Sequence, residues 1–311
     1  MLLADALLAG PDVAIPPSRL SRASDEGSRP AIGGDRLPAW LTAIGWVALF
    51  AQPFFSLVSD WWNLSEAGHG LLLAPLAVWL AWRSGIDPRA RPNRAAGCAI
   101  LIVAVILRYL SSLAAESFIT REAMVVALGG LTIYYHGTRQ IVRWWLPFVL
   151  AILAVPLPEI ITQTLALPLQ FDASRLGAWL LNSRHVPVQL SGNIIGLPGR
   201  QLFVTEACSG LRSLTALISL AVLLGGVGLV RPASRIVLLG LAVPIAIVLN
   251  GLRVFVTGFL VYFLSPSYGE GFLHATEGWL FFIVSFCALA LAKGMIAVAE
   301  RYIPRRAHAH V

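Results

Sequence analysis

Residues 235–263, RIVLLGLAVPIAIVLNGLRVFVTGFLVYF, form a long apolar run in which Asn250 and Arg253 are the strongly polar residues after the opening arginine. The hydrocarbon core of a bilayer is crossed by about 20 consecutive apolar residues in a helix. This stretch is longer than that minimum. It therefore predicts a transmembrane helix, and it sets the frame for the rest of the chain.

The composition agrees with a membrane protein. Of the 311 residues, 57% are hydrophobic and 13% are charged, and the mean hydropathy is +0.76. A soluble domain carries about 25% charged residues, so one large soluble core is excluded. The net charge of +7 comes almost wholly from arginine, since Lys293 is the only lysine. The arginines lie in short connections between apolar runs, which indicates membrane topology rather than nucleic-acid binding.

Eight apolar runs predict an all-α polytopic membrane protein with about eight transmembrane helices. Several of them are shorter than the roughly 20 residues that a crossing usually takes. No internal repeat is evident. The runs cover residues 40–58, 68–82, 95–114, 123–136, 144–157, 209–230, 235–263 and 277–299.

Arginine predicts the orientation. Arginine-rich segments precede the first run and follow the second, fourth, sixth and eighth runs, and loops of this kind stay in the cytoplasm. Both termini are therefore expected there. We expect a disordered cytoplasmic tail over residues 1–39, a membrane domain over residues 40–300 and a cytoplasmic tail over residues 301–311.

The longest connection, residues 158–207, is predicted to lie outside. Residues 158–182 suggest an amphipathic segment at the membrane interface. Residues 185–205, HVPVQLSGNIIGLPGRQLFVT, mix β-branched residues with glycine and proline, which predicts short strands or a hairpin. A short strand-like segment thus leads into the sixth run.

Cys208 lies at that point, in EACSGLRSL, residues 206–214. Ser209 is a candidate N-cap for the helix that follows. A helix N-terminus favours negative charge, so it favours a thiolate, and its free N–H groups can hold an oxyanion. The alternative is a buried structural cysteine beside a capping serine.

Arg253 is the next candidate, because an arginine inside a membrane segment costs on the order of 3 kcal/mol and usually faces a cavity or the bundle interior. Its alternatives are pairing with an acid such as Glu277 or Glu206, and snorkelling to headgroups. Asn250 is a candidate to hydrogen-bond the backbone or to position Arg253.

His274, in GFLHATEGWLFF, residues 271–282, is predicted on the same membrane face as Cys208 and Arg253. A histidine can take the thiol proton and return a proton to a leaving amine. Arginine can stabilise the thiolate or the oxyanion. These three residue types together predict acyl-transfer chemistry.

Other residues compete for supporting roles. Arg212 follows Cys208 by four positions and is an alternative to Arg253. Glu206 is a candidate to orient His274, or it simply favours the helix N-terminus. His69 is predicted on the same face and could join the site. An interfacial histidine beside the aromatic residues Trp61 and Trp62 is an equally good interpretation. No metal or cofactor motif is present in the sequence.

Several stretches together resemble the exosortase/archaeosortase family. They are GHGLLLAPLAVWLAWR (68–83), LPFVLAILAVPLPEIITQTLALPLQFDAS (146–174), SGNIIGLPGRQLFVTEACSGLRSL (191–214), NGLRVF (250–255) and the histidine before the last run. The resemblance covers roughly residues 40–300. It implies a membrane-embedded cysteine protease or transpeptidase whose cysteine, arginine and histidine correspond to Cys208, Arg253 and His274.

The resemblance also implies a substrate and a place. The substrates are secreted proteins with a C-terminal sorting tail (a PEP-CTERM-like tail) made of a Pro-Glu-Pro-like motif, a transmembrane helix and a basic cluster. Processing is expected at the outer face of a bacterial inner membrane through a thioester acyl-enzyme, with hydrolysis and transpeptidation both open. The alternatives are a transporter or flippase, in which Arg253 binds an anionic substrate, and a non-catalytic component of exopolysaccharide assembly.

Overall fold

The computed structural model describes residues 36–64, 67–204, 211–264 and 271–302. The chain divides into two units, residues 1–49 and 50–311. The described part of the first unit is the beginning of helix α1 (Arg36–Asn63). The two predicted tails lie almost wholly outside the described residues.

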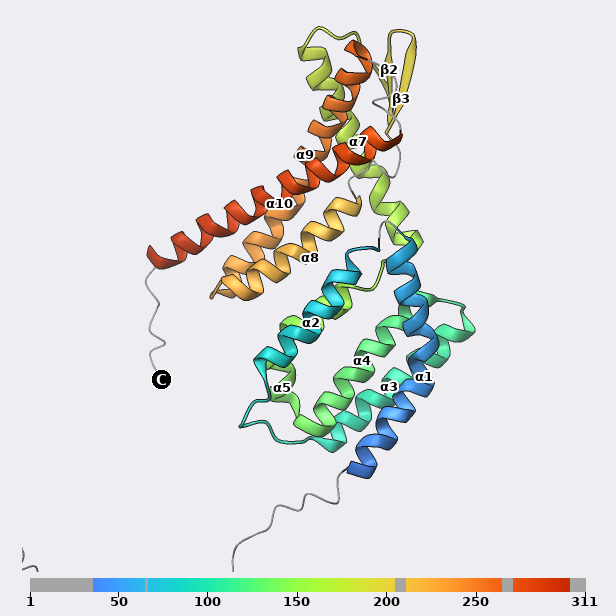
Figure 1. The fold of residues 1–311 in the computed structure, drawn as a ribbon, viewed down its shortest axis with the longest axis vertical. Coiled ribbons are helices and arrows are strands. Elements are labelled where there is room, and N and C mark those ends of the chain that lie inside the picture. The colour runs from blue at the N-terminus through green and yellow to red at the C-terminus, as the bar shows by residue number, and fades with distance from the viewer. Residues whose placement is uncertain (1–35, 65–66, 205–210, 265–270, 303–311) are drawn as a thin grey trace, which may run out of the picture. The chain divides into compact units, whose positions relative to one another are not determined.

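The second unit is largely helical, as predicted, with one small sheet (Figure 1). Each predicted apolar run coincides with one or more helices. After α1 these are α2 (Gly70–Ser84), α3 (Arg94–Leu113), α4 (Ser117–His136), α5 (Thr138–Arg143), α6 (Trp145–Leu153), α7 (Glu159–Ser183), α8 (Leu211–Gly228), α9 (Pro232–Phe263) and α10 (Gly271–Tyr302).

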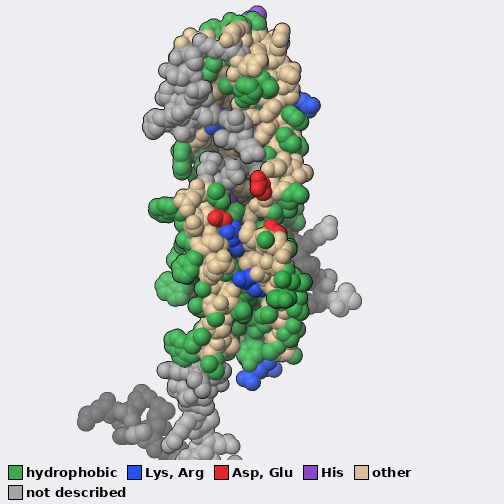
Figure 2. All heavy atoms as spheres, turned by 90° about the vertical axis from the view of Figure 1, so that its right-hand side faces the viewer, with side chains coloured by type: hydrophobic (Ala, Val, Ile, Leu, Met, Phe, Trp, Pro, Cys, Tyr) green, Lys and Arg blue, Asp and Glu red, His purple; other side chains and the backbone are tan. Residues whose placement is uncertain are grey.

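Within the described residues, four helical segments are long and apolar enough to cross a membrane: Trp40–Asn63, Arg94–Leu113, Pro232–Phe263 and Gly278–Tyr302. Two shorter apolar helices, Gly70–Ser84 and Ser213–Gly228, accompany them. Hydrophobic side chains are exposed over much of the face shown in Figure 2. Exposed apolar surface of this extent is typical of helices that face lipid.

The prediction of eight transmembrane helices is not confirmed. The fifth run, residues 144–157, contains only the nine-residue helix α6, which rises about 13 Å at 1.5 Å per residue. The fourth run lies in α4, whose second turn carries Arg121 and Glu122. Neither segment is an uninterrupted apolar helix of crossing length.

Helices α7, α8, α9 and α10 share one buried core. Leu217 of α8, Leu238 of α9 and Leu289 of α10 are completely buried in it. At the far end of this group, Glu300 of α10 accepts the backbone N–H groups of Val230 (3.1 Å) and Arg231 (2.9 Å) in the α8–α9 connection. The core and this carboxylate therefore hold the last three helices together.

Helices α7 and α9 approach closely because small residues line their contact. A Cβ atom added to Gly177 would lie 2.5 Å from Val254 Cγ1, and one added to Gly258 would lie 2.8 Å from Leu181 Cδ1. Both distances are far below a van der Waals contact, so only glycine permits this spacing. The predicted segment 158–182 is thus a packed helix, and it buries small residues while exposing side chains such as Trp179.

The predicted strand-like segment is a three-stranded antiparallel sheet formed by β1 (Gln189–Ser191), β2 (Ile194–Leu197) and β3 (Arg200–Phe203). Gly192 and Gly199 take φ values of +63° and +76° in the two tight connections, a conformation that glycine adopts without strain. Ile195 and Leu197 are buried against α7 and α9. The sheet is therefore a small layer over these two helices.

Candidate active site

Strand β3 leads directly toward the segment that contains Cys208, and its end is firmly held. Val204 is buried, its N–H donates to Asn193 O (2.9 Å), and its carbonyl accepts from Asn193 Nδ2 (3.1 Å). Asn193 Nδ2 also lies 3.1 Å from Gln170 Oε1 of α7. Both backbone groups of Val204 are thus fixed, four positions before Cys208.

The predicted nucleophile itself lies outside the described residues, together with Glu206 and Ser209. The chain is described again from Leu211, where α8 begins, so position 212 is in the first turn of that helix. A strand and a helix therefore flank Cys208, as the sequence predicts.

Arg253 lies on α9 next to the same core that holds the end of β3. Val254, its neighbour, belongs to one buried cluster with Val204 and Ile195. The chain that enters the Cys208 segment and the helix that carries Arg253 are therefore joined through a common set of apolar contacts.

The guanidinium group of Arg253 lies against the backbone of α10. A Cβ atom added to Gly278 would lie 3.1 Å from Arg253 Nη2 and 3.3 Å from its Cζ. These distances are tighter than most real Cβ contacts, so the glycine leaves room for the guanidinium group. Asn250, one turn earlier on α9, is buried at 6% exposure.

Position 274 lies one turn before Gly278 on α10, which begins at Gly271. Residues four apart in a helix lie on the same face. The backbone of His274 is thus on the face of α10 against which the Arg253 guanidinium group packs. The arginine and the histidine position, far apart in sequence, belong to one region of the fold.

His69 lines a different space, a cavity of about 180 Å³. Its Nε2 lies 3.2 Å from Leu153 O, and because a carbonyl oxygen only accepts, this nitrogen carries the proton. Thr215 and Ser219 of α8 line the same cavity. His69 is therefore next to the helix that follows Cys208, and it also has a structural contact at the end of α6.

Three residues near these features were not predicted as site residues. Glu122 lines the His69 cavity, and its Oε1 is buried with no hydrogen-bond partner among the described residues. Gln170 and Asn193 hold the end of β3. In the sequence, these three residues are marked only by a polar side chain among apolar neighbours. That pattern does not predict which residue each side chain contacts.

The fold defines a class: a helical membrane protein with several apolar helices and a small sheet before one of them. Residues 61–291 match the family model described as transmembrane exosortase (Exosortase_EpsH). The match covers well over half of the chain, and the protein belongs to this family. No curated protein and no solved structure gives a significant match.

Proposed function

We propose that this exosortase is a cysteine peptidase or transpeptidase that removes C-terminal sorting tails from secreted proteins at the outer face of a bacterial inner membrane. Membership of the transmembrane exosortase family supports a transpeptidase-like role. The observation that carries the assignment of residues is the placement of Arg253 against α10, one turn from the backbone of His274, beside the core that anchors Val204.

In the proposed reaction, His274 removes the proton from the thiol of Cys208. The thiolate sulfur attacks the carbonyl carbon of the scissile peptide bond, and the carbonyl electrons move to its oxygen. Arg253 and N–H groups at the start of α8 stabilise this oxyanion. The C–N bond then breaks, the tail leaves as an amine with the proton from His274, and a thioester remains on Cys208.

Supporting roles follow from the same region. Asn250 lies one turn from Arg253 and is proposed to position it. Glu206 is proposed to orient His274, Ser209 to cap α8, and His69 to line the approach to that helix. Arg212 is an alternative to Arg253 as the oxyanion ligand. No cofactor enters the proposed chemistry.

The test is co-expression with a secreted substrate that carries a PEP-CTERM-like tail. We expect Cys208→Ala, Arg253→Ala and His274→Ala to leave the tail uncleaved on an immunoblot. The matched controls are Cys98→Ala and Cys287→Ala, which replace exposed cysteines on α3 and α10. Full processing by Cys208→Ala would exclude cysteine chemistry.

The mass of the new C-terminus separates the two possible acceptors. Water resolves the thioester to a free carboxylate, whereas an amine acceptor leaves a new amide with the acceptor's added mass. Arg253→Lys distinguishes the two arginines: lysine keeps the charge but loses the planar fork of donors. Processing that falls strongly in Arg253→Lys but not in Arg212→Lys identifies Arg253 as the oxyanion ligand.

A further inference from the structure

The connection between α2 and α3 is fixed in place by the helix that follows α4. Gln140 is completely buried; its Nε2 donates to Gly85 O (3.1 Å), and its Oε1 accepts the N–H of Asp87 (2.9 Å). Trp144 Nε1 also donates to Gly85 O, at 3.1 Å. The conformation of this connection is therefore set by side chains of α5 and the residue after it.

A second contact holds the connection from the other side. Gly137 has a φ of +87°, and an added Cβ atom there would collide with the carbonyl group of Arg91. The backbone N–H of Asn93 donates to Ile133 O (3.1 Å). The backbone that carries the arginines of this connection is consequently held in place by packing and hydrogen bonds to the end of α4.

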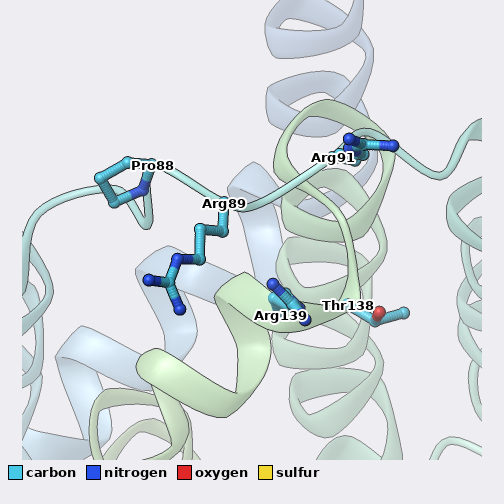
Figure 3. A pocket seen from close by; sticks show the side chains of 5 residues that line it. All are labelled: Pro88, Arg89, Arg91, Thr138 and Arg139. Carbon is cyan, nitrogen blue, oxygen red and sulfur yellow. The ribbon is translucent and has the colours of Figure 1, made fainter.

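These contacts create a hollow of about 680 Å³, lined by Pro88, Arg89, Arg91, Thr138 and Arg139. In Figure 3, the side chain of Arg89 extends from the connection toward α5, beside Arg139. An adjoining hollow of about 460 Å³ shares Arg89 and Arg139 and adds Asp87, Val142 and Arg143. Cationic side chains from two separate parts of the chain thus surround one space.

Within the part of the chain that the structure describes, no ion pair neutralises Arg89, Arg91 or Arg139. Among the described residues, the ion pairs are Arg121–Asp60 and Arg175–Asp172, and neither involves Arg89, Arg91 or Arg139. Asp87, the one acid in the lining, accepts the backbone N–H of Arg89 (2.9 Å). Three exposed guanidinium groups, each with several donors in a plane, match the oxygens of a phosphate group.

The surroundings distinguish a lipid from a soluble anion. Trp82, Ile86 and Val142 are exposed at 79%, 56% and 73%. Val142 lines the adjoining hollow, Ile86 directly precedes Asp87 of that lining, and Trp82 lies in the last turn of α2. The membrane-spanning segment Arg94–Leu113 begins three positions after Arg91. Charge and apolar surface therefore adjoin at the end of a span, where lipid headgroups meet acyl chains.

We propose that this arginine-lined hollow binds the phosphate group of an anionic membrane phospholipid, whose acyl chains lie along the apolar surface of Trp82, Ile86 and Val142. The site is separate from the proposed peptidase chemistry and does not depend on it. It would tie the connection between α2 and α3 to one leaflet of the membrane.

The test uses the full chain in phosphatidylcholine nanodiscs, titrated with phosphatidylglycerol and examined by native mass spectrometry. The variant Arg89→Gln/Arg91→Gln/Arg139→Gln is expected to bind phosphatidylglycerol on the order of tenfold to a hundredfold more weakly than wild type. The charge-matched control is Arg175→Gln/Arg184→Gln/Arg301→Gln, which removes three exposed arginines elsewhere and should bind like wild type.

A second variant keeps all the arginines. Val142→Glu places a carboxylate in the adjoining hollow and is expected to weaken phosphatidylglycerol binding by repulsion, whereas Val142→Gln is expected to weaken it less. Equal binding by wild type and the triple variant would overturn the proposal. Displacement of the lipid by inorganic phosphate, with no preference for phosphatidylglycerol over the free ion, would equally overturn it in favour of a soluble-anion site.

Discussion

Arg253 shows how a single residue can combine burial and chemistry. It lies in the long, mostly apolar helix α9, and its guanidinium group packs against Gly278 of α10, where no side chain intervenes. A cation in such a place usually faces the interior of a helix bundle. Its proximity to Gly278 makes that glycine a determinant of where the guanidinium group lies.

We predict that Gly278→Ala lowers sorting-tail cleavage severalfold while changing the melting temperature little. The added methyl group would displace the Arg253 guanidinium group by a few tenths of an ångström, which is enough to disturb an oxyanion contact. The measurement is the rate of tail cleavage alongside thermal unfolding in detergent.

The matched control is Gly294→Ala, on the same helix, where an added Cβ atom meets nothing within 4 Å. It should cleave at the wild-type rate. If both alanine variants behave alike, the contact between Gly278 and Arg253 has no part in the reaction.

At the scale of elements, α1 and α4 are joined by an ion pair that the sequence does not predict. Arg121 Nη2 lies 2.6 Å from Asp60 Oδ2, with 7% of the arginine side chain exposed, and 3.3 Å from Ser56 Oγ. The ion pair therefore ties the end of α1 to the second turn of α4.

We predict that Arg121→Met lowers the free energy of unfolding by about 3 kcal/mol, because it leaves the Asp60 carboxylate partly buried without its partner. The measurement is a denaturant titration in detergent micelles. The control is Arg175→Met, which breaks the exposed pair with Asp172 (3.6 Å) and should cost less than about 1 kcal/mol. Similar losses in the two variants would contradict the structural role of the buried pair.

The elements also show what periodicity and composition can predict. The run at 95–114 corresponds to α3 (Arg94–Leu113), and the glycine- and proline-rich stretch at 185–205 contains the three strands. These signals are local. By contrast, the bond between Asn193 and Gln170 and the packing of Gly177 on Val254 join residues far apart in sequence. A single sequence does not indicate which distant residues make such contacts.

At the scale of the whole molecule, the distribution of arginine predicts which connections share a side of the membrane. Arg89, Arg91 and Arg139, predicted on one side from sequence, do gather around one hollow. His69, predicted near the other side, lines one cavity together with Thr215 of α8. We propose that the first group lies on the cytoplasmic side of the membrane and the second on the outer side.

We predict that Arg184→Cys is labelled by a membrane-impermeant maleimide on intact spheroplasts, whereas Pro92→Cys is labelled only after permeabilisation. Both positions are exposed, and both variants are made in a background without the three native cysteines. The labelling is read by gel shift. Reversed labelling would place the proposed active site in the cytoplasm and exclude secreted proteins as substrates.

The end of helix α6 shows how side chains can satisfy backbone carbonyl groups where a helix stops early. This helix ends at Leu153, and its last carbonyls are met by Trp61 Nε1, 2.7 Å from Ala154 O, and by the ring of His69. Carbonyl groups without a hydrogen-bond donor are poorly tolerated in hydrocarbon, so a backbone that leaves its helix there needs donors from side chains or water. Two aromatic rings from α1 and the residue before α2, and not the length of α6, therefore satisfy the carbonyl groups where this helix ends.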